Sequence, residues 1–184
     1  MTTCGDDDQI THLAMAAGQG DRVALSQFIA ATQSDVWRTV AYLAEPASAD
    51  DLTQETFLRA IRSLPRFEAR STARTWLLSI ARRVVADQIR HNKSRPRTAH
   101  VTDLDAAMTH GRRASRIEDV VEIRMLLDGL DPERREAFVL TQVLGLSYAE
   151  AAEVSGCPIG TIRSRVARAR GDLVRAASEA DRAG

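Results

Sequence analysis

Apolar residues recur every three or four positions along most of the chain, which is the spacing of a helix with one buried face. From residue 8 to residue 43 this spacing predicts two helices, separated either near Gly18–Gly20 or at Thr32. It predicts a third helix over about residues 49–64 and a fourth over about residues 72–92. The first half of the chain is therefore expected to form a bundle of four helices.

Residues that favour helix ends mark the limits of the third and fourth helices. Ser48 is the expected N-cap of the third helix, which has two acids in its first turn and stops at Pro65. Thr72 is the expected cap of the fourth helix. The buried stripe of the fourth helix is predicted to consist of Trp76, Leu77, Ile80, Val84 and Ile89.

Helical spacing is lost over residues 94–116 and returns at Ile117, so we predict a linker between two helical halves. The second half opens with an apolar stripe of Ile117, Val120, Val121, Met125 and Leu126. Asp131 and Pro132 then signal a helix start, and this helix is expected to continue through Leu144 to an end at Gly145.

Composition agrees with a helical chain, because only 4% of the 184 residues are aromatic and Ala, Leu and Arg are frequent. We predict an all-α protein with two small helical domains, residues 8–93 and 117–178, joined by a flexible linker over residues 94–116. No apolar run approaches the roughly 18–20 residues of a membrane span, and the N-terminus is acidic, so we expect a cytoplasmic protein without membrane insertion. Cys4 and Cys157 lie far apart, which argues against a disulfide framework or a zinc site.

Charge is strongly segregated, although 25 basic and 25 acidic residues give a formal net charge of zero. Residues 74–97 hold seven bases against one acid, and residues 161–175 hold five bases against one acid. A single charged stretch is usually a solvated helix face. Two basic helices, each preceded by an acidic segment, favour a nucleic-acid partner.

The strongest motif is a helix-turn-helix that begins at Gly145. Ser147 can cap a short first helix, Gly156 supplies a left-handed turn, and a second helix opens at Pro158 or Ile159 and runs to about residue 177. Cys157 in the turn is expected to be a small packed residue rather than a reactive thiol.

The second helix of this motif has an inward and an outward face. Ile162 and Val166 are four residues apart and are expected to pack inward. The early outward positions are Thr161, Arg163, Ser164, Arg165 and Arg168. Side chains there reach base edges in the major groove, where arginine commonly reads guanine.

Two further patterns lie in the first half. Asp51, Gln54, Glu55 and Leu58 share one helix face and form an acidic ridge, which taken alone is equally well a capped surface helix. The following basic helix carries Trp76, which taken alone is better explained as a core residue than as a stacking platform.

The order of these features resembles a bacterial sigma factor of the extracytoplasmic-function (ECF) group, in the sigma-70 family. The strings DDLTQETF, RTWLLSIARRVVAD and GLSYAEAAEVSGCPIGTIRSRVARAR carry the resemblance, which covers about residues 9–177. It implies a sigma-2 domain and a sigma-4 domain that together recognise a promoter and help to open it, with catalysis left to the polymerase. It also implies three partners: core RNA polymerase, through its largest and second-largest catalytic subunits, promoter DNA, and an anti-sigma factor.

The resemblance assigns candidate binding residues. The core polymerase site would comprise Asp50, Asp51, Leu52, Gln54, Glu55 and Phe57. The site for the melted −10 element and its flipped base would comprise Phe67, Arg70, Ser71, Arg74, Trp76, Arg82, Arg83 and Arg90. The −35 element would be read by Thr161, Arg163, Ser164, Arg165 and Arg168. One departure stands out, because Ala69 occupies a loop position where many relatives carry glycine.

Two other classes of function compete with a sigma factor. A free-standing helix-turn-helix regulator would explain the second half equally well, but it leaves the acidic ridge and the basic Trp-bearing helix unexplained. An enzyme is disfavoured, because the four histidines lack metal-ligand spacing and the chain shows no glycine-rich phosphate loop. We therefore expect neither a cofactor nor a bound metal.

Overall fold

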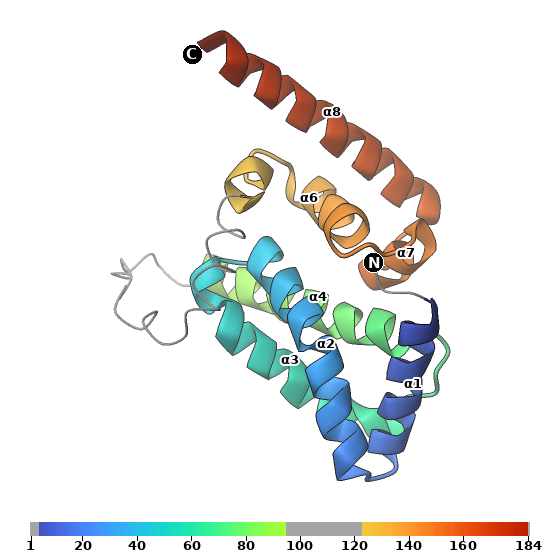
Figure 1. Ribbon diagram of the computed structural model, residues 1–184. Helices are drawn as coiled ribbons and strands as arrows, with labels where there is room; N and C mark the ends of the chain where they lie inside the picture. The colour runs from blue at the N-terminus through green and yellow to red at the C-terminus, as the bar shows by residue number, and fades with distance from the viewer. Residues whose placement is uncertain (1–3, 95–122, 184) are drawn as a thin grey trace.

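The computed structural model describes residues 4–94 and 123–183, and the regular elements in these ranges are helical (Figure 1). The first bundle consists of α1 (Cys4–Gly18), α2 (Arg22–Leu43), α3 (Ala49–Ser63) and α4 (Ala73–Ser94). Two short 3-10 turns, Pro46–Ser48 and Leu64–Arg66, flank α3. Most of the predicted linker and the positions Ile117, Val120 and Val121 lie outside the described residues.

The second bundle begins with a helical turn over residues 123–127. It continues with α6 (Pro132–Phe138), a π-helical turn (Val139–Val143), α7 (Tyr148–Ser155) and α8 (Ile159–Ala183). Figure 1 shows α8 as a long helix across the outer side of this bundle, while α6 and α7 face the first bundle. Among the described helices, none has an apolar stretch that could span a lipid bilayer.

The break between the first two helices falls at Gly18–Gly20, and the alternative break at Thr32 is wrong. Thr32 lies inside α2, where its hydroxyl donates to the Phe28 carbonyl at 2.7 Å. Asp21 caps α2 by accepting from two backbone N–H groups. Gly18 packs against the end of α3, because a Cβ there would lie 2.6 Å from the Leu64 carbonyl oxygen.

Three local predictions are wrong. Ser48 makes no capping hydrogen bond, because the 3-10 turn runs directly into α3 and leaves Ser48 in helical conformation. Met125 and Leu126 are 72% and 67% exposed, whereas Leu127 is buried instead, so the helical phase differs from the predicted stripe by one residue. Ile89, predicted to lie on the buried stripe of α4, is 40% exposed.

Capping in the second bundle follows the sequence signals. Asp131 accepts from the Glu133 N–H with Pro132 next to it, and Ser147 and Glu150 form a reciprocal capping box. Gly156 ends α7 with φ +63°, where a side chain would be strained. The inward residues of α8, Ile162 and Val166, are 0% and 1% exposed, as predicted.

The two bundles are in contact along α4. Figure 1 shows α4 between the other helices of the first bundle and the pair α6–α7. The C-terminal end of α2 also approaches the second bundle, since Arg124 donates to the carbonyls of Ala41 and Ala44.

Candidate nucleic-acid and polymerase interface

The acidic ridge lies on an outward face of α3. Asp51, Gln54 and Leu58 are exposed, and Glu55 is half-buried. Ile61 is 38% exposed one turn further along. The ridge therefore combines carboxylates with two accessible apolar side chains, which suits a protein partner.

Of the other candidate residues of α3, two are buried and Asp50 is exposed. Leu52 and Phe57 are 6% and 8% exposed and belong to the core. Asp50 accepts a hydrogen bond from the Trp37 indole N–H at 3.1 Å. Leu52 and Phe57 therefore anchor α3 in the core, and a partner would contact the ridge and Asp50.

Glu55 is tied to α4 through a shared arginine. Arg59 donates to Glu55 at 2.7 Å and to Asp87 of α4 at 2.6 Å. These hydrogen bonds, chiefly that to Asp87, raise the pKa of Arg59, and the bond from Arg59 is the main reason that the pKa of Asp87 is lowered. The network fixes the ridge relative to the basic helix behind it.

The loop between α3 and α4 forms a hollow of about 340 Å³, which we call the loop hollow. Its lining residues are Arg66, Phe67, Glu68, Arg70, Ser71 and Trp76. The Phe67 and Trp76 rings lie 4.9 Å apart at 43°, and Ala69 holds a left-handed φ of +51°. Trp76 thus packs against the core and also lines the hollow, so the two roles weighed for it are compatible.

The four arginines of α4 differ sharply in exposure. Arg83 and Arg90 are exposed, and Arg90 pairs with Asp87. Arg82 is half-buried and donates to Glu136 of α6 at 2.7 Å. Arg74 is only 5% exposed.

Arg74 lies at the junction of the two bundles. Its Nε donates to Asp35 of α2 at 2.6 Å, and a terminal N–H donates to the Leu144 carbonyl at 2.7 Å. In this arrangement Arg74 contacts protein on both sides and is not on the surface. The sequence does not predict the burial of Arg74, because its two partners lie 39 and 70 positions away along the chain.

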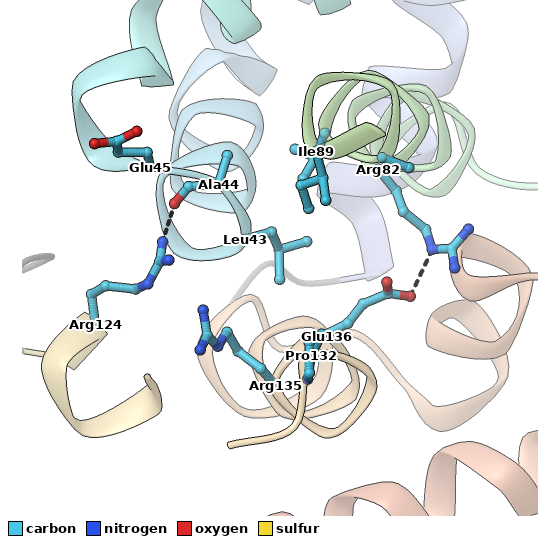
Figure 2. Close-up of a pocket in the computed structure, with 11 residues that line it drawn as sticks. Leu43, Ala44, Glu45, Arg82, Ile89, Arg124, Pro132, Arg135 and Glu136 are labelled. Carbon is cyan, nitrogen blue, oxygen red and sulfur yellow. Dashed lines mark hydrogen bonds and ion pairs between the residues drawn. The ribbon is translucent and has the colours of Figure 1, made fainter. Parts of the chain in front are cut away.

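A cavity of about 300 Å³ also lies between the bundles (Figure 2). Leu43 and Ile89 point toward it, and Arg82, Arg124 and Arg135 surround it. Burial, followed by repulsion from Arg124, lowers the pKa of Arg135. Each of these guanidinium groups has a carboxylate partner, either Glu136 or Asp128.

The start of α8 presents the predicted reading residues. Arg163, Ser164 and Arg168 are exposed, and Thr161 is half-buried. Arg165 differs from them, because its side chain is 19% exposed and pairs with Glu133 of α6. It also donates to the Cys157 sulfur at 3.6 Å. Glu133 was not singled out from the sequence, since its approach to α8 depends on the tertiary fold.

In the described ranges, 4–94 and 123–183, no group of three or more His, Cys, Asp or Glu residues is arranged so that it could hold a metal ion. The candidate binding residues form three separate surfaces: the ridge, the loop hollow and the start of α8.

Family models match both halves of the chain. Residues 28–95 match sigma-70 region 2, and residues 121–173 match sigma-70 region 4. The ECF RNA polymerase sigma factor SigC of Mycobacterium tuberculosis is 57% identical over 182 residues, covering 99% of this chain and 98% of SigC. The RNA polymerase sigma-H factor of Pseudomonas aeruginosa is 31% identical over 175 residues, covering 89% and 91%.

Solved structures show the same architecture. CnrH, solved with the cytosolic domain of CnrY, superposes with a TM-score of 0.72 at 27% identity, covering 93% of this chain and 98% of CnrH. RpoE, solved with the anti-sigma factor NepR from Bartonella quintana, gives a TM-score of 0.63 at 28% identity, covering 80% and 92%. With both conserved regions present in order over nearly the full length of its relatives, the chain belongs to the ECF sigma factors of the sigma-70 family, non-enzymatic subunits with which RNA polymerase initiates transcription.

Proposed function

We propose that the three exposed surfaces divide the work of promoter recognition. The ridge on α3 docks on core RNA polymerase, the loop hollow takes an unstacked base of the melted −10 element, and the start of α8 reads the −35 element. The observation that carries this proposal is the helix-turn-helix, whose left-handed Gly156 turn leaves Arg163, Ser164 and Arg168 exposed at the start of its second helix.

The loop hollow suits a flipped base for two reasons. Its volume of about 340 Å³ lies within the range of small-ligand pockets, and its wall includes the paired rings of Phe67 and Trp76. Arg70 is exposed at its rim, and Arg83 and Arg90 are exposed along α4. These cations would neutralise the phosphates of a single strand.

The two DNA surfaces have to move apart to act together. A −35 and a −10 element lie about 25 base pairs apart, which is about 85 Å along B-form DNA at 3.4 Å per step. A compact chain of this size is only about 40 Å across. The 28 residues from 95 to 122 can span at most about 90–100 Å. Promoter binding would therefore separate α4 from α6 and α7, and that separation would free Arg74 and Arg82.

An anti-sigma factor is the proposed regulatory partner. One structural neighbour, the sigma factor RpoE, was solved with the anti-sigma factor NepR, and a second, CnrH, was solved with the cytosolic domain of CnrY; this chain covers 92% of RpoE and 98% of CnrH. We place the protein in the cytoplasm, because its polymerase partner works there.

The first test is transcription in vitro from a pool of genomic promoter fragments, with bacterial core polymerase alone and with this protein added. Discrete transcripts that require the protein would support promoter recognition, and their start sites would give the promoter sequence. Retention of duplex DNA without transcription would contradict the proposed promoter opening.

The polymerase surface is tested by reversing charge on the ridge. Asp51→Lys with Glu55→Lys should abolish co-elution with core polymerase while binding to a −35 duplex persists. The matched control is Asp8→Lys with Glu179→Lys, which changes net charge equally at exposed positions away from the ridge. Unchanged co-elution of the ridge variant would refute docking through α3.

A further inference from the structure

Helix α6 is a junction of ion pairs, because all four of its charged side chains have partners. Arg134 pairs with Asp172, Arg135 with Asp128 and Glu136 with Arg82. These three pairs join α6 to its own bundle or to α4. The fourth, Glu133, pairs with a residue of the DNA-reading surface, Arg165.

Arg165 is held more firmly than its neighbours on that surface. One terminal nitrogen donates to Glu133 and the other to the Cys157 sulfur, and the side chain is 19% exposed, whereas Arg163 and Arg168 are exposed. A guanidinium is a rigid planar fork with five N–H donors. Fixing part of the fork therefore orients the remaining donors.

Orientation matters because guanine is recognised by two coplanar hydrogen bonds from one arginine. A free arginine loses side-chain entropy when it adopts that geometry, whereas a held arginine has already lost it. The carboxylate of Glu133 is also 68% exposed, so it adds negative charge near approaching phosphates. It would lower the sequence-independent part of the affinity for any DNA.

We infer that Glu133 is a positioning residue for −35 recognition: it fixes the Arg165 guanidinium for base reading and reduces sequence-independent binding. This inference rests on the proposed reading role of α8. It predicts opposite effects on the two kinds of binding, because removing the carboxylate weakens base selection while it strengthens attraction to phosphate.

The experiment measures base preference with the holoenzyme. A duplex library carries a mapped −10 element and a randomised −35 element, and bound duplexes are sequenced for wild type, Glu133→Gln, Glu133→Ala and Arg165→Ala. We expect guanine enrichment at one position, lost in Arg165→Ala and reduced about three- to tenfold in both Glu133 variants. Affinity for a duplex without promoter elements should rise in the Glu133 variants, and Glu133→Asp should restore part of the preference.

Glu153→Gln is the matched control, because it removes an exposed carboxylate from α7. It should raise affinity for non-promoter DNA without changing base preference. Base preference that is unaltered in Glu133→Gln, while Arg165→Ala changes it, would overturn the positioning role. An unaltered base preference in Arg165→Ala would show that Arg165 does not read a base, and it would overturn the inference for that reason. The proposed docking of α3 on core polymerase would not be affected by this result. Thermal unfolding of each variant separates both results from a folding defect.

Discussion

Replacing Arg74 by methionine tests whether this arginine stabilises the fold or serves DNA alone. Methionine keeps much of the apolar stem and removes the guanidinium. The Arg74 and Asp35 side chains are 6% and 24% exposed, and Arg74 also satisfies the Leu144 carbonyl. Removing one partner of a buried ion pair costs about 3–5 kcal/mol. Because Asp35 keeps some access to water, we expect a loss of about 2–3 kcal/mol in the free energy of unfolding.

Urea unfolding followed by circular dichroism measures this loss. The control is Arg83→Met on the same helix, where the side chain is exposed and the expected change is below about 0.5 kcal/mol. The double variant Arg74→Met with Asp35→Asn should recover part of the loss, because it leaves no unpaired carboxylate. Stability of Arg74→Met within about 0.5 kcal/mol of wild type would refute the structural role.

Three further changes test local features. Gly18→Ala should destabilise the first bundle by about 1–3 kcal/mol in the same urea assay, because its Cβ would lie 2.6 Å from the Leu64 carbonyl oxygen. Ala69→Val should cost about 1 kcal/mol or more at φ +51°, whereas Ala69→Gly should be neutral or stabilising, again by urea unfolding. Burial raises the pKa of Asp7 against the opposing effect of Arg74, so the folded state binds this proton more tightly than the unfolded state. The contribution of Asp7 to the free energy of unfolding therefore falls as the pH rises from 3.8 through the raised pKa. In Asp7→Asn this pH dependence should be weaker, as measured by urea unfolding at pH values between about 4 and 7.

Helix ends were predictable where a short-range signal sets them. Asp131 with Pro132, Ser147, and Gly156 each act within a few residues, and the structure confirms all three. Ser48 failed because a preceding 3-10 turn supplies the helix start, and a serine in helical conformation does not cap. The prediction for Met125 and Leu126 failed because apolar residues stand at positions 123, 125, 126 and 127, and this spacing does not show which of them face the core.

The candidate surfaces were predictable only in part. The exposure of charged side chains at the start of α8 and on the ridge can be predicted from the spacing of residues along a helix. The carboxylate and carbonyl partners of Arg74, Arg82 and Arg165 do not follow from it, because they lie between 32 and 70 positions away along the chain. The resemblance assigned DNA contacts to all four arginines of α4, but the structure leaves only Arg83 and Arg90 of these four exposed.

Because Arg74 and Arg82 bond across the contact between the two bundles, separating the bundles has a cost in free energy. Separating them breaks the Arg74–Leu144 hydrogen bond and the Arg82–Glu136 ion pair. In the proposed opening, Arg74 would keep its bond to Asp35 within the first bundle, so its exposed guanidinium would already be oriented. A partner that binds only the open form loses apparent affinity by the factor by which the closed form is favoured. Phosphate contacts by the freed arginines would offset part of that loss at any DNA, because they carry no sequence information, so the choice of promoter would still have to come from base contacts.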